Sequence, residues 1–221
     1  MGADGALGVL QTRRLRRAKW NDVPHAHARS DFANWQGMKR AVDLVMSASL
    51  LVLFAPFMFL IWITVIVTSD GPGLHWSERV GRDGQFRMPK FRTMAHGSPL
   101  SPRESLANAG GHITVIGGFL RRWALDELPQ LWSILRGDMS FIGPRPLLAS
   151  DPASMEREKF PVVAEVRPGL SGLAQVAGRN RLTPRRKALF DALYARKCCA
   201  ALDAQILLRR LNGFSFTPRA G

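Results

Sequence analysis

The sequence predicts a mainly helical α+β fold with an N-terminal membrane helix, one β-hairpin and several short, partly amphipathic helices. Three observations support this prediction: an apolar run at 42–67, a strand pattern around the Asp-Gly pair at 83–84, and helical spacing of apolar residues after 114. The apolar run is long enough to cross a bilayer. The expected divisions are a mobile basic tail at 1–37, the membrane helix at 38–69 and a domain on the membrane surface at 70–221.

The apolar run carries one charge, Asp43, and a proline near its middle, Pro56. Both of its flanks are strongly basic, and basic flanks stay on the cytoplasmic side, so a straight span would place one flank on the wrong side. Proline removes a helical hydrogen bond and clashes with the preceding turn, which bends the helix. We therefore expect a re-entrant helix that enters and leaves through one face. An ordinary tilted transmembrane helix with a proline kink is the alternative.

The formal net charge of +14 admits either nucleic acid or an anionic membrane surface as a partner. Arginines are spread along the chain, no nucleic-acid motif is present, and the apolar run already indicates a membrane. The expected partners are therefore anionic lipids of a membrane and not nucleic acid. The two cysteines, Cys198 and Cys199, are adjacent, and neighbours in sequence rarely form a structural disulfide, which fits a reducing cytoplasm.

A β-hairpin is predicted at 78–94, directly after the membrane segment. Asp83-Gly84 supplies the left-handed backbone conformations that a tight turn needs, and Pro89 suits an edge strand. The stretch at 95–111 is rich in Gly, Ser, Pro and Ala, which predicts a loop long enough to act as a lid.

Helices are expected to dominate the second half of the chain. Thr114 begins the first, and apolar residues at i, i+3, i+4 and i+7 predict another at 127–136, ended by Gly137. Pro129 fits only the first turn of that helix, which places Asp126 at or next to the N-cap. The remaining predicted elements are a proline-rigidified loop at 141–146, a turn at 168–169, a helix at 183–197 and a last helix at 203–211.

Asp126 and Glu127 are the leading candidates for catalysis. The positive end of a helix dipole and nearby arginines such as Arg121 and Arg145 should keep both carboxylates ionised. An ionised aspartate can attack phosphorus or hold Mg²⁺ beside a phosphate. Mg²⁺ together with arginines offsets the repulsion between carboxylate and phosphate. An Asp-Glu pair at a helix start is more often a capping feature, and the residues alone leave that alternative open.

Several basic residues are candidate ligands for phosphate. A proline on each side fixes the backbone around Arg145, which suits a bidentate phosphate contact. Lys90 and Arg92 alternate along the predicted hairpin and share one face, where they form either a phosphate clamp or a solvated basic surface. Arg179 lies in a predicted turn and is a further candidate.

A series of motifs occurs in a fixed order along about residues 37–211. The motifs are Lys39-Arg40-x-x-Asp43, Gly71-Pro72, Glu78-Arg79-Val80-Gly81, Lys90-Phe91-Arg92-Thr93-Met94, Leu125-Asp126-Glu127-Leu128-Pro129-Gln130, Gly137-Asp138-Met139-Ser140, Gly143-Pro144-Arg145-Pro146 and Pro168-Gly169-Leu170-Ser171-Gly172. Together they resemble the bacterial sugar transferases, the monotopic polyprenyl-phosphate phosphoglycosyl transferases. The chain is similar to the short form that initiates exopolysaccharide synthesis.

The resemblance implies an activity. A sugar 1-phosphate moves from a UDP-sugar to undecaprenyl phosphate, UMP is released, and assembly of a surface glycan begins at the cytoplasmic face of the bacterial inner membrane. The resemblance also implies Mg²⁺ as a cofactor and a two-step reaction through a covalent aspartyl-phosphosugar intermediate. The sequence leaves open which sugar is transferred, which glycan pathway is served and whether the protein forms a homodimer.

The functional residues of the family fall on positions already singled out. Its aspartate nucleophile falls on Asp126, with Mg²⁺ beside it, and its glutamate partner falls on Glu127. Its phosphate-handling arginines fall on Arg121, Arg145 and Arg179. Its re-entrant helix is broken at a Ser-Pro pair, which is Ala55-Pro56 here.

One departure from the family pattern and two alternative functions remain. Gly118 stands where the family commonly has a basic residue, which is expected to loosen that helix. A second hypothesis is a non-catalytic basic membrane adaptor, in which arginines bind lipid headgroups and Asp126 merely caps a helix. A third, based only on charge, is a membrane-tethered nucleic-acid binder.

Overall fold

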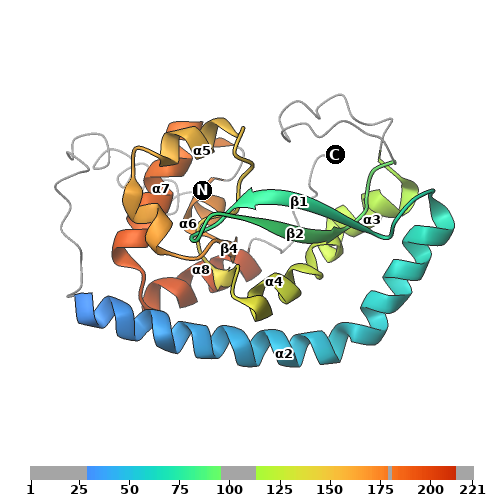
Figure 1. Ribbon diagram of the computed structural model, residues 1–221, viewed down its shortest axis with the longest axis horizontal. Helices are drawn as coiled ribbons and strands as arrows, with labels where there is room; N and C mark the ends of the chain where they lie inside the picture. The colour runs from blue at the N-terminus through green and yellow to red at the C-terminus, as the bar shows by residue number, and fades with distance from the viewer. Residues whose placement is uncertain (1–28, 96–112, 179–180, 213–221) are drawn as a thin grey trace, which may run out of the picture.

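The computed structural model describes residues 29–95, 113–178 and 181–212. Its elements are α2 (Arg29–Thr68), β1 (Leu74–Val80), β2 (Gln85–Phe91), α3 (Val115–Trp123), η3 (Leu125–Glu127), α4 (Gln130–Arg136), β3 (Ser140–Ile142), α5 (Pro152–Arg157), η4 (Pro161–Glu165), β4 (Gly169–Ser171), α6 (Leu173–Ala177), α7 (Pro184–Lys197) and α8 (Ala200–Asn212). α2 runs along one side of the molecule, and the hairpin of β1 and β2 crosses its middle (Figure 1). The predicted mainly helical α+β class is confirmed.

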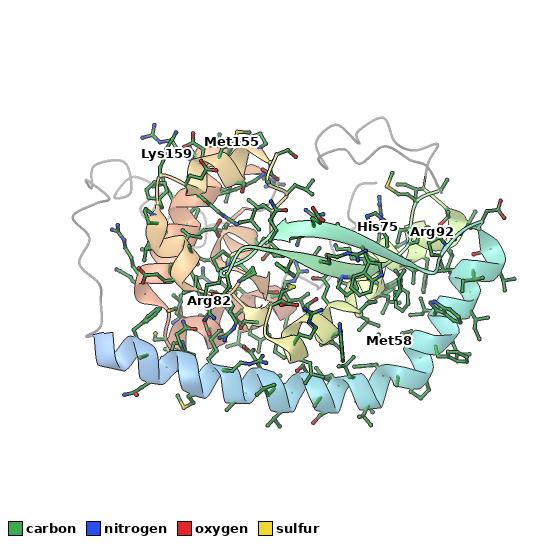
Figure 2. The ribbon with its side chains drawn as sticks, in the orientation of Figure 1. Met58, His75, Arg82, Arg92, Met155 and Lys159 are labelled. Carbon is green, nitrogen blue, oxygen red and sulfur yellow. The ribbon has the colours of Figure 1, made fainter. Side chains whose placement is uncertain are left out.

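α2 is one unbroken helix of 40 residues that contains Pro56. It bends where Met58 lies, and its last turns point toward the hairpin (Figure 2). Loss of a single helical hydrogen bond at a proline bends a helix without ending it. The bend expected at Ala55-Pro56 is therefore present, and the backbone stays helical through it.

The helix begins at Arg29, well before the predicted membrane segment at 38–69. Phe32 and Trp35 pack against a buried cluster that α7, α8 and β3 help to form. Tertiary packing of this kind stabilises helical turns that local sequence alone does not predict. The predicted mobile tail was therefore wrong for residues 29–37, and its remainder, 1–28, lies outside the described residues.

Most of the apolar surface of α2 faces away from the protein. Only 11% of its most apolar window is buried, and Val52 is 78% exposed. A core helix of a soluble protein would bury such side chains, so the length, composition and exposure of α2 suit a membrane-inserted helix. Among the described helices, it is the one long and apolar enough to cross a bilayer.

Polar contacts hold both ends of α2 on the same globular domain. Toward its N-terminus, Arg40 donates to the carbonyl oxygens of Ile134 and Leu135 in α4 at 2.6 and 2.8 Å. At its C-terminus, Arg92 donates to the carbonyl oxygen of Ser69 at 2.6 Å. A domain that holds both ends fits a helix that enters and leaves through one membrane face, and the re-entrant topology stays a prediction.

The hairpin forms as the sequence predicts. β1 and β2 pair antiparallel along their whole lengths, and Gly81 donates its backbone N–H to the carbonyl oxygen of Gly84 at 2.8 Å. Gly84 has φ 113°, a left-handed conformation that glycine adopts without steric cost. The pairing predicted at 78–94 is confirmed, although β1 already begins at Leu74. The predicted loop falls almost wholly within 96–112, which lies outside the described residues.

Local signals also place the later helices. Thr114 caps α3 and Thr183 caps α7, each by accepting a backbone N–H through its side chain. α8 begins at Ala200, three residues before the predicted start. Within the loop predicted at 141–146 and the turn predicted at 168–169, β3 and β4 form a short parallel pair that the sequence did not predict. Strands this short show no alternation that could be recognised.

The helix predicted at 127–136 needs a correction. It begins only at Gln130, because Leu125–Glu127 form a separate 3-10 turn, η3. Pro129 occupies the N-cap position of α4, where its missing backbone N–H costs nothing. Asp126 therefore does not cap α4. The N-cap position of α4 belongs to Pro129.

α4 joins the hairpin to α2. A buried cluster lies between these elements, and Leu50 and Leu51 of α2 pack against it. Its buried members are Met88, Leu131, Ile134 and Met139. Burial of such side chains is the main stabilising contribution in a domain of this size. The cluster holds β2, α4 and α2 side by side.

Two adjacent glycines of α3 differ in how closely the rest of the chain approaches them. α3 forms through Gly118, so the expected loosening does not prevent the helix. An added Cβ at Gly117 would lie 2.2 Å from the carbonyl oxygen of Thr93, whereas one at Gly118 meets none of the described atoms within 4 Å. We expect Gly118→Ala to raise the free energy of unfolding by about 0.5–1 kcal/mol and Gly117→Ala to lower it by about 1–3 kcal/mol. Chemical denaturation in detergent measures both, and equal effects would contradict this packing.

Candidate active site

Asp126 and Glu127 lie together in η3, between α3 and α4. Ala124 ends α3 and opens η3 in the left-handed conformation, with φ 56°, a conformation that costs a non-glycine residue about 1 kcal/mol. Asp126 is 9% exposed, and the side chain of Glu127 is 16% exposed. A tight reversal of the chain thus holds two largely buried carboxylates side by side.

Two cations contact Glu127 directly. The Nζ of Lys90 lies 3.1 Å from Oε1 of Glu127, and Nη2 of Arg145 lies 3.4 Å from the same oxygen. Burial opposes ionisation of Glu127, but the charges of Lys90, Arg145 and Arg210 outweigh it and hold its pKa far below the ordinary value. Glu127 is therefore ionised at neutral pH and keeps both cations next to the dyad.

Arg121 approaches the dyad from the last turn of α3. Its Nε donates to the hydroxyl oxygen of Thr93 at 2.8 Å. Burial lowers the pKa of its guanidinium, and the negative charge of Asp126 opposes that effect, so the two groups interact electrostatically. The structure therefore brings Lys90, Arg121 and Arg145, three of the predicted phosphate ligands, to the two carboxylates.

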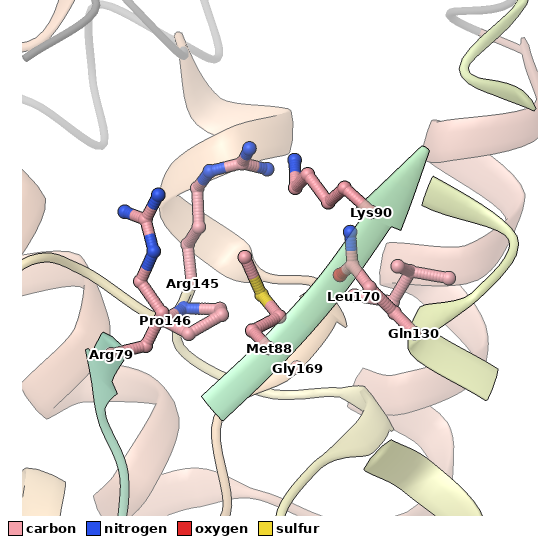
Figure 3. A pocket seen from close by; sticks show the side chains of 8 residues that line it. All are labelled: Arg79, Met88, Lys90, Gln130, Arg145, Pro146, Gly169 and Leu170. Carbon is pink, nitrogen blue, oxygen red and sulfur yellow. The ribbon is translucent and has the colours of Figure 1, made fainter. Parts of the chain in front are cut away.

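A cleft lies next to these cations. It is lined by Arg79, Met88, Lys90, Gln130, Arg145, Pro146, Gly169 and Leu170. The guanidinium groups of Arg79 and Arg145 and the ammonium group of Lys90 gather along one side of the cleft (Figure 3). Such a concentration of positive charge suits a phosphate-bearing ligand.

The loop that carries Arg145 is held by its backbone. Gly169 donates its N–H to the carbonyl oxygen of Pro144, and Arg157 donates to that of Arg145, both at 2.8 Å. A Cβ at Gly169 would lie 2.0 Å from the backbone nitrogen of Gly143, so these two segments need glycine to approach so closely. The predicted rigid loop is present and presents Arg145 to the cleft in a fixed position.

Comparison with known proteins decides the family. The sequence model described as "Bacterial sugar transferase" matches residues 34–216. The chain belongs to the bacterial sugar transferase family. This membership confirms the resemblance drawn from the motifs.

Curated relatives of this sugar transferase carry informative names. It is 35% identical to an undecaprenyl-phosphate galactose phosphotransferase of Salmonella typhimurium, over 78% of this chain and 39% of that protein. It is 36% identical to a UDP-glucose:undecaprenyl-phosphate glucose-1-phosphate transferase of Caulobacter vibrioides, over 82% and 71% respectively. It is 32% identical to the exopolysaccharide production protein ExoY of Rhizobium meliloti, over 78% and 83%. The chain spans about two fifths of the length of several relatives, the Salmonella protein among them.

Arg92 does not join Lys90 in the cleft of this sugar transferase. β2 ends at Phe91, and Nη2 of Arg92 donates to the carbonyl and hydroxyl oxygens of Ser69 at 2.6 and 2.8 Å. The guanidinium caps the C-terminus of α2, where a helix leaves carbonyl groups without partners. The prediction of a phosphate clamp was therefore wrong for Arg92. The other distant candidate, Arg179, lies outside the described residues.

The carboxylates of Asp126 and Glu127 are the candidate ligands for a metal ion. Across residues 29–95, 113–178 and 181–212, no group of three or more His, Cys, Asp or Glu side chains gathers to hold a metal. Mg²⁺ commonly takes one or two carboxylates and completes its shell with water and substrate phosphates. Asp126 beside a basic cleft fits such a site, whereas Oε1 of Glu127 is already engaged by two cations. Binding of Mg²⁺ at Asp126 stays a prediction.

Sequence reasoning missed three residues around the dyad. Arg79 and Gln130 line the cleft, and Arg210, in the last turn of α8, acts on the charge of Glu127. Arg79 and Gln130 both stand within motifs that carry the family resemblance, which was the signal that could have found them. No local feature separates Arg210 from the neighbouring Arg209, so only the fold identifies it.

Proposed function

We propose that this chain is a phosphoglycosyl transferase, a polyprenyl-phosphate sugar-1-phosphate transferase, that moves a sugar 1-phosphate from a UDP-sugar to undecaprenyl phosphate and releases UMP. The main support is the buried pair of Asp126 and Glu127, ringed by cations and placed beside a basic cleft. The names of its relatives, which act on undecaprenyl phosphate or serve exopolysaccharide production, support the same reaction. The reaction would be the first membrane step of exopolysaccharide or other glycan assembly.

In the first step, a carboxylate oxygen of Asp126 attacks the β-phosphorus of the UDP-sugar. The bond from this phosphorus to the bridging oxygen breaks, and UMP leaves with that oxygen. The product is an aspartyl phosphosugar. Arg121 and Lys90 reduce the repulsion between the carboxylate and the diphosphate, and Arg145 stabilises the charge that develops on UMP.

In the second step, a phosphate oxygen of undecaprenyl phosphate attacks the same phosphorus. The acyl phosphate bond breaks, the carboxylate of Asp126 is restored, and undecaprenyl diphosphate sugar is released. Each step exchanges one phosphorus–oxygen bond for another, so neither requires a redox partner or a net proton transfer. Two steps through one site let a soluble donor and a membrane acceptor react without being bound together.

Glu127 acts in this scheme as a positioning residue. It fixes Lys90 and Arg145 through one carboxylate oxygen, which preorganises both cations for the diphosphate. Mg²⁺, held by Asp126 together with the substrate phosphates, would supply further neutralisation of phosphate charge.

The anchor explains where the reaction takes place. α2 exposes its apolar surface and is held at both ends by the domain that contains the dyad. A re-entrant α2 in the inner membrane would keep that domain on the cytoplasmic face, at the depth of lipid headgroups, where the acceptor phosphate lies. The basic surface of the protein favours anionic lipids around it.

UMP release from individual UDP-sugars tests this function. Detergent-purified protein, Mg²⁺ and undecaprenyl phosphate should give catalytic turnover with at least one sugar of a panel, because the site recognises the diphosphate and not only the sugar. A non-catalytic membrane adaptor, which the buried dyad does not favour, would release no UMP from any of them. If the protein releases no UMP but binds oligonucleotides with an affinity that falls steeply as the salt concentration rises, it is a membrane-tethered nucleic-acid binder instead.

A further inference from the structure

The cleft extends from Lys90 past Arg145 to Arg79. Arg79, Arg145 and Lys90 follow one another along it, with Arg79 at the end far from Lys90 (Figure 3). Glu127 is the partner of both Lys90 and Arg145. By contrast, Arg79 has no carboxylate within 4 Å among the described residues, and its Nε donates only to the hydroxyl of Ser77 at 3.1 Å.

The charge of Arg79 is costly where it lies. Burial lowers the pKa of its guanidinium, and the charge of Arg145 lowers it further, while the charge of Asp151 opposes both effects. Two neighbouring guanidinium groups that repel each other are stabilised when an anion binds between them. The Arg79 end of the cleft therefore has the electrostatic character of a second phosphate position, separate from the one beside Asp126.

Gln130 supplies an independent observation in the same cleft. Its side chain is only 3% exposed, and its amide Nε2 has no hydrogen-bond partner among the residues that the structure describes. The carboxamide projects into the cleft on the side of Lys90 (Figure 3). A buried donor without an acceptor destabilises a protein, so its presence in a cleft indicates an acceptor that arrives with a ligand.

We propose that Arg79 and Gln130 form the subsite for the nucleotide part of the donor. This inference rests on the proposed function, which identifies the ligand as a nucleoside diphosphate sugar. In phosphoryl transfer the attacking and leaving oxygens lie roughly in line, so the leaving group departs on the side away from Asp126. The α-phosphate then lies between Arg145 and Arg79, and the Gln130 amide donates to an acceptor oxygen of the same nucleotide.

Equilibrium binding of UMP tests this subsite without turnover. Arg79→Gln and Gln130→Leu should each weaken UMP binding and raise KM for the UDP-sugar by about tenfold or more, as expected for a lost charge-assisted or buried hydrogen bond. KM for undecaprenyl phosphate should stay unchanged. Arg79→Lys should recover part of the UMP affinity, because the positive charge remains but the planar fork is lost.

Stability separates a binding role of Gln130 from a structural one. Gln130→Leu removes an unpaired buried donor at similar volume, so the ligand-free protein should melt at the same or a higher temperature. Arg82→Gln is the matched control for Arg79→Gln, since Arg82 lies on the exposed turn of the same hairpin and bonds only to Asp83 among the described residues. It should leave UMP binding and both KM values unchanged.

Other outcomes overturn the proposal. Wild-type protein that does not bind UMP, or variants that bind it as tightly as wild type, would remove the subsite. A rise in KM for undecaprenyl phosphate with unchanged UMP affinity would assign the cleft to the acceptor phosphate instead. Wild-type protein that binds UMP through Arg79 but turns over no UDP-sugar would leave the subsite in place and contradict the proposed reaction.

Discussion

Asp126→Asn is expected to lower UMP release from a UDP-sugar by on the order of 10⁴-fold or more, as loss of a nucleophile commonly does. The amide that replaces the carboxylate is neutral and weakly nucleophilic, so it forms no acyl phosphate. The loss should be the same with and without undecaprenyl phosphate, because it affects the first step. Detection of UMP over time measures it.

Asp83→Asn is the matched control for that substitution. Asp83 undergoes the same change of atoms but lies on the exposed hairpin turn, paired with Arg82. It should retain wild-type turnover. Turnover of Asp126→Asn at the wild-type rate would rule out Asp126 as the nucleophile, and a lower rate in both variants would point to a general effect on the protein.

Arg145→Lys is expected to lower kcat/KM for the UDP-sugar by about 10²–10³-fold, the usual effect of losing one preorganised donor at a developing charge. A lysine keeps the positive charge but lacks the planar fork that binds two phosphate oxygens at once. Arg145 already contacts the carboxylate of Glu127. The ammonium of a lysine at this position would pair with that carboxylate and would then have no second donor group to offer the phosphate.

Steady-state kinetics over a range of UDP-sugar concentrations measures this effect. Arg82→Lys provides the control, because that arginine is half-buried on the hairpin turn and lies outside the cleft. An Arg145→Lys variant with unchanged kcat/KM would contradict the assignment of Arg145 to the leaving group.

Signals confined to a few neighbouring residues predicted the structure well. The glycine at position 84, which has a positive φ, predicted the hairpin turn. Thr183 followed by Pro184 predicted the start of α7. The bend of α2 followed from Pro56 in the same way. Each of these features depends on backbone sterics and hydrogen bonds within one or two turns, and these can be worked out from the sequence.

Features that depend on distant residues were not predictable in the same way. The first turns of α2 form because Phe32 and Trp35 meet a cluster contributed by the end of the chain. Arg92 was expected beside Lys90 by strand alternation, but the strand ends between them and the carbonyls at the end of α2 bind its guanidinium. The charge of Arg210 acts on Glu127 although the two residues lie far apart in the sequence.

The residues of the candidate site were predicted from two sources together, the chemistry of the side chains and the order of the family motifs. Residue type and order identified Asp126, Glu127 and Arg145, and the structure brings all three together. Their local conformation differed from expectation, because the dyad lies in a 3-10 turn that Pro129 separates from α4. The chemistry was therefore easier to predict from the sequence than the backbone that presents it.

The covalent aspartyl phosphosugar can be detected in a single experiment. Wild-type protein is mixed with Mg²⁺ and a UDP-sugar that it accepts as a substrate, in the absence of undecaprenyl phosphate. The reaction is then quenched and analysed by mass spectrometry of the intact protein and of its peptides. We expect a burst of about one UMP per protein and the added mass of a sugar phosphate on the peptide that contains Asp126. UMP that forms only when undecaprenyl phosphate is present, with no mass added to that peptide, would contradict it.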